Sequence, residues 1–426
     1  MRPTGPALAA GLLAAAAATA AATGRANGPA TRPATTTTDL LLEAIRREHD
    51  MPAIAAAAIR DGRVGAVGAV GERKAGSGVT VTPADRFHIG SCTKAMTATM
   101  IARLVQDGLL RWEMTVEQGL PEIARQALPA YRKMTLRHLL THRAGLIKDW
   151  PKSASFRDVH DLPGPPRKQR EAFVAMVLRR PPVARPGEEF HYSNAGYTVA
   201  AAFAERAADA PWETLMRRLI FEPLGMTSAG FGAMGTPGKI DQPWQHRLAG
   251  KKRVPVGPGR LSDNPPAIGP GGTVHCSMGD WAKFVAAHLA GARGEKTPLK
   301  LTAETWRQLH TTPPGGNYAM GWAVTERSWG GGRVLTHAGS NTMNFAVVWM
   351  APKRSYAVLV ATNQGGEAAA KACDKAAATL IRAFPPVTRR TAQRNADGRE
   401  EETAEDEYGR DEQVTDRWTT SRITIR

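Results

Sequence analysis

The stretch HIGSCTKAMTATM, from His88 to Met100, places a serine three residues before a lysine within an apolar segment. The apolar residues do not alternate with polar ones, which favours a helix, and Gly108 is a suitable stop for it. Residues three apart share a helix face, so we expect Ser91 and Lys94 to be neighbours. Two interpretations stay open at this point. Either Ser91 caps the helix while Lys94 reaches water, or Ser91 is a nucleophile and Lys94 its proton acceptor.

Strand patterns lie near both ends of the chain, with helical patterns between them. AIAAAAIRDGRVGAVGAV predicts a hairpin that turns at Asp61 and Gly62. Four further strands are predicted close together, in YAMGWAVTE, RVLTHAG, NFAVVWMAP and SYAVLVATN. Helices are predicted in DLLLEAIRREHD, in AAAKACDKAAATLIRAF and through most of the middle, including TLRHLLTHRAGL. This order argues against a βαβ repeat. It predicts an α+β fold in which both chain ends form one antiparallel sheet, flanked by helices, with an inserted mainly helical region.

Composition divides the chain into four parts. Residues 1–23 carry Arg2 and then an alanine-rich run, which predicts a signal peptide and an exported protein, periplasmic or secreted. Residues 24–37 are predicted to be a low-complexity linker, and residues 38–385 a folded domain. Residues 386–426 are densely charged, and we expect a disordered tail there. The first segment is too weakly apolar to predict stable membrane insertion.

The formal charge of +17 over 426 residues raises the question of a nucleic-acid partner. Lysine and arginine are scattered, without a basic stripe interleaved with aromatics, so we expect a solvated basic surface and no nucleic-acid binding. The three cysteines, Cys92, Cys276 and Cys373, allow at most one internal disulfide, and whether any pair is bridged stays open. Cys92 is expected to be a small core residue.

Two later motifs bear on the role of Ser91. PGEEFHYSNAGY contains Tyr192 and Asn194 in a Tyr-x-Asn arrangement, and THAGSNTMNF places His337 and Gly339 at the end of a predicted strand. Penicillin-recognising enzymes carry S-x-x-K, a second polar triplet and K-T-G in this order. Here the first element matches, the second has the Tyr-x-Asn form, and the third keeps its glycine but has histidine for lysine.

With these motifs in order, the chain resembles the serine β-lactamase and DD-peptidase superfamily, in the branch near class C β-lactamases, D-aminopeptidases and related esterases. The resemblance covers roughly Leu41–Phe384 and includes MTLRHLLTHRAGL, FEPLGMTSAGF, GPGGTVHCSMGDWAKF and YAMGWAV. It implies the β-lactamase/transpeptidase-like fold for residues 38–385.

The resemblance also implies a role for each matching residue. Ser91 is the expected acylated nucleophile, Lys94 the base beside it and Tyr192 the second member of the proton relay. Asn194 is expected to bind the substrate and Lys94. The backbone N–H groups of Ser91 and Ser340, next to Gly339, are expected to form the oxyanion hole. Physically, Lys94 must be largely neutral to accept a proton, and burial would lower its pKa for that purpose.

The histidine at position 337 is the main departure from the motif. In β-lactamases and DD-peptidases the lysine at this place offers a charge to a substrate carboxylate, whereas esterase and aminopeptidase relatives carry histidine. Histidine is mostly neutral at pH 7, so His337 is expected to donate a hydrogen bond without requiring an anion. Carboxylate recognition is therefore in doubt.

Other candidate groups are weaker. His138 and His142 lie four apart in a predicted helix, as zinc ligands can, but no glutamate lies between them and no third ligand is evident. No G-x-S-x-G motif occurs, which counts against an α/β-hydrolase. Asp263 and Glu188 are expected to be solvated loop residues. We expect no metal and no organic cofactor.

The sequence therefore predicts an exported serine hydrolase that works through an acyl-enzyme on Ser91. Its substrate would be a small molecule or a peptide with an ester or amide bond. Two alternatives stay open: a β-lactamase or DD-carboxypeptidase in the narrow sense, and a non-catalytic, penicillin-binding-like recognition domain. The intact serine, lysine and tyrosine argue against the second, because a pure binder needs no proton relay.

Overall fold

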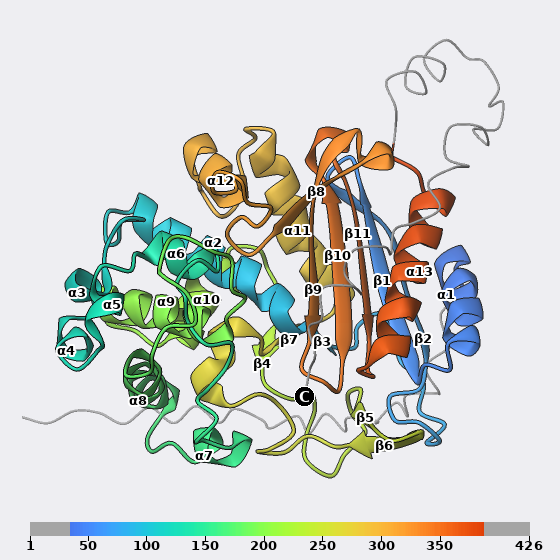
Figure 1. The fold of residues 1–426 in the computed structure, drawn as a ribbon. Coiled ribbons are helices and arrows are strands. Elements are labelled where there is room, and N and C mark those ends of the chain that lie inside the picture. Colours follow the sequence, from blue (N-terminus) through green and yellow to red (C-terminus); the bar gives the residue numbers. More distant parts are fainter. Residues whose placement is uncertain (1–34, 387–426) are drawn as a thin grey trace, which may run out of the picture. The chain divides into compact units, whose positions relative to one another are not determined.

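A six-stranded antiparallel sheet, built from both ends of the described chain, organises the fold (Figure 1). The computed structural model describes residues 35–386, so the predicted signal peptide, most of the predicted linker and residues 387–426 lie outside it. The strand order is β2-β1-β11-β10-β9-β8. The strands are β1 (Ala53–Arg60), β2 (Arg63–Gly71), β8 (Ala323–Arg327), β9 (Gly332–Ser340), β10 (Phe345–Ala351) and β11 (Tyr356–Thr362). The predicted α+β fold and its sheet are confirmed.

The hairpin between β1 and β2 turns where the sequence predicts it. Asp61 and Gly62 have φ angles of 52° and 73°, the left-handed conformation that a tight two-residue turn requires. Strand β1 then pairs with β11, with Ala57 opposite Leu359, which joins the first strands to the last ones.

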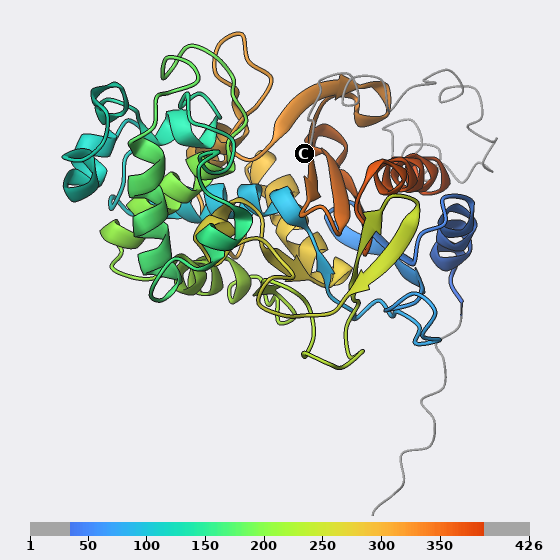
Figure 2. The ribbon, with the colours of Figure 1, turned by 60° about the horizontal axis from the view of Figure 1, so that its bottom comes forward.

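Helices cover both faces of the sheet. Helices α1 (Thr37–Glu48) and α13 (Glu367–Ala383) pack side by side on one face, and α11 (Met278–Ala292) packs on the other (Figure 2). Strand β1 therefore has both of its faces buried: Ala55 and Ala57 belong to one apolar cluster, and Ala56 belongs to the other. This explains why AIAAAAI shows no polar alternation, since a strand buried on both sides reads as a continuous apolar run.

A mainly helical region is inserted between β2 and β8, as predicted (Figure 1). Its helices are α2 (Thr93–Gln106), α3 (Val116–Gly119), α4 (Pro121–Ala124), α5 (Pro129–Arg132), α6 (Leu136–Leu140), α7 (Phe156–His160), α8 (Pro166–Leu178), α9 (Asn194–Ala207), α10 (Trp212–Met216), α11 and α12 (Ala303–His310). It also holds the short strands β3 (Phe87–His88), β4 (Gly230–Phe231) and β7 (Val274–Cys276), and the hairpin of β5 (Gln245–Ala249) and β6 (Lys252–Val256).

Cysteine pairing and membrane insertion, both considered from the sequence, can be compared with the described residues. Cys92, Cys276 and Cys373 are all buried and unbridged, and Cys92 packs in the core as expected. Within residues 35–386, no helix has the length and apolar character needed to cross a membrane.

Candidate active site

Helix α2 begins at Thr93, two residues after Ser91, and carries Lys94 into the protein interior. A single 3₁₀ turn, Gly90–Cys92, leads into the helix. Lys94 has no exposed surface, and its Nζ lies 3.0 Å from Ser91 Oγ. The opening interpretation in which Lys94 extends to water is therefore wrong. The i, i+3 spacing places the two side chains together, as the sequence predicts.

The surroundings of Lys94 favour a neutral amine. Its Nζ also lies 2.5 Å from Asn194 Oδ1 and 2.6 Å from the carbonyl oxygen of Gly271, and both of these atoms can only accept. Burial lowers the pKa of Lys94 to about 7, and Asp149 opposes that shift in part. A neutral amine has two hydrogens and one lone pair. When the hydrogens go to Asn194 and Gly271, the lone pair is left for Ser91 Oγ.

Tyr192 approaches the same serine from the start of α9. Its hydroxyl donates a hydrogen bond of 2.7 Å to Ser91 Oγ. The next residue, Ser193, caps α9 by accepting from the Gly196 amide and donates to the Ile147 carbonyl, which holds this segment against the loop of residues 147–149. Burial raises the pKa of Tyr192 above its ordinary value, so the phenol is protonated at neutral pH. A protonated phenol therefore fits this site better than a phenolate.

Asn194 links Lys94 to an acidic residue that sequence reasoning missed. Its Oδ1 accepts from Lys94, and its Nδ2 donates to Asp149 Oδ1 over 2.6 Å. Because an amide has one accepting and one donating end, these two contacts fix its orientation. The Asp149 carboxylate thus acts on Lys94 from the far side of the amide, and no motif in the sequence marked it.

Two glycines bring the end of β9 against the turn that carries Ser91. Gly90 has a φ of +50°, and a β-carbon there would lie 2.4 Å from the Ser340 nitrogen. A β-carbon at Gly339 would lie 2.0 Å from the Ile89 carbonyl oxygen and 2.7 Å from the Ser91 nitrogen. Any other residue at either position would separate the two backbones. The predicted oxyanion donors, the amides of Ser91 and Ser340, therefore lie at a contact that only glycine permits.

His337 is buried and both of its ring nitrogens have protein partners. Nδ1 lies 2.7 Å from the Ala338 carbonyl, which can only accept, so Nδ1 carries the hydrogen. Nε2 therefore accepts from the Tyr318 hydroxyl, 2.9 Å away. Burial, with a smaller effect of Lys94, lowers the pKa of His337 to about 3. The expectation of a neutral side chain agrees with this environment, whereas a hydrogen bond donated to substrate would require His337 to release one of these partners.

The helix predicted for TLRHLLTHRAGL ends early, which corrects the pairing of His138 with His142. Helix α6 stops at Leu140, and His142 has a φ of +56°, so the two histidines do not share a helix face. His142 is buried, its Nδ1 accepts from the Ser193 amide, and its ring lies 4.3 Å from that of Tyr192. Among residues 35–386, no group of three or more potential metal-ligating side chains is assembled.

The expectation of a solvated Asp263 is wrong. Asp263 is 5 % exposed, and its carboxylate accepts from His88 and Asn341, whereas Glu188 is exposed as expected. The hydrogen-bond partners of Asp263 come from distant parts of the chain, so its loop composition gave no sign of burial. Gly271 was missed for a different reason, because a backbone carbonyl leaves no signature in a sequence.

Comparison with known proteins gives a family, two curated relatives and a shared fold. The family model described as Beta-lactamase matches residues 38–382. The chain is 25% identical over 342 residues to penicillin-binding protein 4 of Amycolatopsis lactamdurans, covering 76% of this chain and 84% of the relative. It is 26% identical over 308 residues to the D-alanyl-D-alanine-carboxypeptidase/endopeptidase AmpH of Escherichia coli K12, covering 66% and 75%. The octameric penicillin-binding protein homologue from Pyrococcus abyssi shares the fold, with a TM-score of 0.65 and 24% identity over 82% of this chain and 77% of that one.

Proposed function

The chain belongs to the Beta-lactamase family of serine hydrolases, and from that premise we propose that it is an exported enzyme that forms an acyl-enzyme on Ser91. Its substrate would be a small ester, amide or peptide. One observation carries the proposal: Ser91 Oγ lies within hydrogen-bond distance of both a buried lysine that contacts no carboxylate and a protonated tyrosine. A serine nucleophile needs a base for its own proton and a donor for the leaving group, and this pair supplies both.

In the proposed reaction the lone pair of neutral Lys94 takes the proton of Ser91 Oγ as that oxygen attacks the substrate carbonyl. The bond to the leaving group then breaks, and Tyr192 donates its proton to the departing oxygen or nitrogen. The proton held by Lys94 restores the phenol. Water then attacks the acyl-enzyme, with the same two groups acting in the reverse sense, and Ser91 regains its proton.

The negative charge that develops on the carbonyl oxygen would be stabilised by the amides of Ser91 and Ser340. The close approach of Gly90 and Gly339 supports this role, since it holds the two backbone segments together. Ser91 also precedes a helix N-terminus, where the helix dipole favours negative charge.

For the substrate we propose uncharged esters or amides in preference to carboxylate-bearing β-lactams. His337 presents no positive charge at the place where lactam-cleaving relatives have lysine, and its two nitrogens are occupied by Ala338 and Tyr318. Beside it, the exposed Phe190 and the ring of Tyr318 border a surface hollow that Arg143 and Glu189 also line. The carboxypeptidase named among the relatives keeps the narrower alternative open, namely a peptide that ends in a carboxylate.

Labelling with a fluorophosphonate probe tests the nucleophile. We expect one added mass, mapped to the peptide that contains Ser91, and no labelling of Ser91→Ala. Ser277→Ala, which removes the cap of α11, is the matched control and should still be labelled. Labelling that persists in Ser91→Ala would refute the proposal.

A substrate panel separates the remaining alternatives. Short-chain esters, D-amino-acid amides, penicillins and a D-Ala-D-Ala peptide would be compared by kcat/KM on the same preparation. Highest activity on neutral esters supports the proposal, and highest activity on lactams or D-Ala-D-Ala supports the narrower reading. Stoichiometric labelling without turnover of any substrate would indicate a recognition domain.

The proposal of export rests on the composition of residues 1–23, where Arg2 precedes an alanine-rich run. N-terminal sequencing of the protein recovered outside the cytoplasm tests it. We expect the mature chain to start near Ala22. Recovery of the full chain, Met1 included, from the cytoplasm alone would contradict export.

A further inference from the structure

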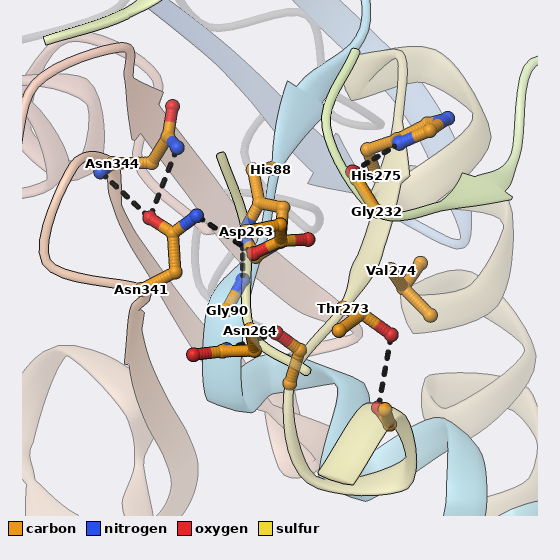
Figure 3. A network of polar contacts seen from close by, with 12 residues as sticks. His88, Gly90, Gly232, Asp263, Asn264, Thr273, Val274, His275, Asn341 and Asn344 are labelled. Carbon is orange, nitrogen blue, oxygen red and sulfur yellow. Dashed lines mark hydrogen bonds and ion pairs between the residues drawn. The ribbon is translucent and has the colours of Figure 1, made fainter. Parts of the chain in front are cut away.

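A buried polar network lies directly behind the turn that carries Ser91, and Asp263 is at its centre (Figure 3). The Asp263 side chain reaches two segments that are far apart in the sequence. Oδ2 lies 2.9 Å from His88 Nε2, and Oδ1 accepts from Asn341 Nδ2 over 2.9 Å. His88 has no exposed surface, Asp263 is 5 % exposed and Asn341 is 6 % exposed. Buried contacts of this kind hold defined geometries because a broken one leaves an unpaired polar group.

The contacts of His88 define its tautomer. Nδ1 lies 3.1 Å from the Gly90 amide, which can only donate, so Nδ1 is the unprotonated nitrogen. Nε2 then carries the hydrogen and donates it to Asp263. The His88 imidazole therefore links the Asp263 carboxylate to the amide of Gly90, the residue immediately before Ser91. The position of the carboxylate thus determines the position of that amide.

The network has two arms: one runs from Asp263 through His88 to Gly90, and the other, the β9 arm, runs from Asp263 through Asn341 to the end of β9. Asn341, which donates to Asp263, follows Ser340 at the end of that strand. Its Oδ1 accepts from the amides of Met343 and Asn344, which closes the turn into β10. The side chain is thus tied at both ends, and its contact with Asp263 sets where the backbone leaves Ser340.

The two arms reach the residue before one predicted oxyanion donor and the residue after the other. Gly90 precedes Ser91, and Asn341 follows Ser340. We propose that Asp263 is a positioning residue that sets the spacing between the amides of Ser91 and Ser340 through His88 and Asn341. The inference rests on the proposed serine-hydrolase function and adds a residue that touches no reacting atom.

The loop that carries Asp263 also leads to the base. The next residue, Asn264, donates to the Gly272 carbonyl over 3.0 Å, and the neighbouring Gly271 carbonyl accepts from Lys94. The His160 ring binds the Asp263 carbonyl, which holds the loop from its other side. A displaced Asp263 would therefore disturb the oxyanion donors first and the contact of Lys94 second.

The test replaces Asp263 by asparagine and measures the oxyanion hole directly. The amide keeps the shape but can accept from only one of His88 and Asn341, so one arm loosens. In the acyl-enzyme, strong donors polarise the ester carbonyl and lower its infrared stretching frequency. We expect Asp263→Asn to shift this band to higher frequency. For p-nitrophenyl butyrate we expect kcat to fall about 10- to 100-fold, with KM changing less than about twofold.

Asp280→Asn is the matched control. Asp280, at the start of α11, is also 5 % exposed, and its carboxylate also has two partner residues, since it accepts from the Ser228 amide and hydroxyl and from Lys283 Nζ. Replacement of a purely structural carboxylate by asparagine should lower thermal stability but leave the frequency of the acyl-enzyme carbonyl band unchanged. The same band and the same kcat in Asp263→Asn and wild type would overturn the proposal.

A second variant covers the case in which Asp263→Asn does not fold. Asn341→Ala leaves the contact of Asp263 with His88 in place and removes its contact with β9, together with the contacts of Asn341 with Gln245, Met343 and Asn344. We expect the same direction of band shift with a smaller loss of kcat. An unshifted band in this variant would also overturn the proposal. A wild-type protein that is not labelled on Ser91 would refute the proposed function itself, whereas normal labelling with unshifted variants would refute only the role of Asp263.

Discussion

Two basic side chains are fully buried in the helical region, and their surroundings are opposite. Arg170, on α8, and Lys94, on α2, both have no exposed surface. Arg170 contacts two carboxylates, with 2.7 Å to Glu205 and 2.7 Å to Glu213, and these raise its pKa. Lys94 contacts only neutral acceptors and a hydroxyl, and burial lowers its pKa to about 7.

The difference lies in how the charge is compensated. A buried cation with two carboxylates stays charged and ties its neighbours together, as Arg170 does between α8, α9 and α10. A buried lysine without a carboxylate contact is held near the point where it gives up its proton. The first arrangement serves the fold and the second suits proton transfer, so burial of a charge alone does not identify a reactive residue.

Replacement of Lys94 by methionine should give the largest effect on activity. The variant loses the proposed base but keeps the volume of the side chain, so we expect kcat/KM on a neutral ester to fall at least 10³-fold. The free energy of unfolding should fall by about 1–3 kcal/mol, because Asn194 Oδ1 and the Gly271 carbonyl lose a buried donor. Lys371→Met, at an exposed position of α13, should leave both quantities unchanged. Retention of a tenth of the activity in Lys94→Met would remove Lys94 as the base.

Replacement of Arg170 by methionine should act on stability instead. Glu205 would remain buried without its cation, and a broken buried ion pair typically costs about 3–5 kcal/mol. Chemical denaturation would measure that loss, while kcat per labelled active site should stay within about twofold of wild type. A stable Arg170→Met protein with lost activity would contradict the division between the two cations.

The pH dependence of kcat/KM should follow the protonation of Lys94. Only its neutral form accepts a proton, and that form is populated above a pKa of about 7. We therefore expect kcat/KM on a neutral ester to rise about tenfold per pH unit below 7 and to level off above it. The raised pKa of Tyr192 predicts no decline from that group up to pH 10. A flat profile between pH 5 and 9 would count against Lys94.

Replacement of Asp149 by asparagine should shift the pH dependence of kcat/KM. The Asp149 carboxylate raises the pKa of Lys94 from across Asn194, so its removal should shift the acidic limb to lower pH. Thermal unfolding of the variant checks that the protein stays folded. A shift to higher pH would show that the coupling has the opposite sign.

His337→Lys should give the smallest effect. A lysine near the site would favour substrates with a carboxylate by about 1 kcal/mol, or about fivefold in the ratio of kcat/KM values for a penicillin and a neutral ester. His337→Gln, which adds no charge, is the control and should leave the ratio unchanged. An equal shift in both variants would assign the effect to the loss of the Tyr318 contact.

The sequence motifs contain most of the residues that meet at the candidate active site, but they do not reveal the buried residues around them. Spacing identified Ser91 and Lys94, and the resemblance to the superfamily motifs identified Tyr192 and Asn194. The structure brings these side chains together. Asp263 could not be recognised, because its contact with His88 joins residues 175 apart in the sequence. The helix predicted through His142 was wrong because the apolar pattern of LLTH continues past the point where the chain turns at His142.

Local pattern was enough to predict the antiparallel sheet from both chain ends, the hairpin at Asp61 and Gly62, and the neighbourhood of Ser91 and Lys94. Each depends on periodicity or on residues within one turn of a helix, which the order of side chains specifies directly. Tertiary structure alone decided that Lys94 meets no carboxylate, that His337 is saturated by Ala338 and Tyr318, and that Asp263 lies behind Ser91. These features depend on which distant segments share a buried space, and burial there sets both the protonation states and the hydrogen-bond partners.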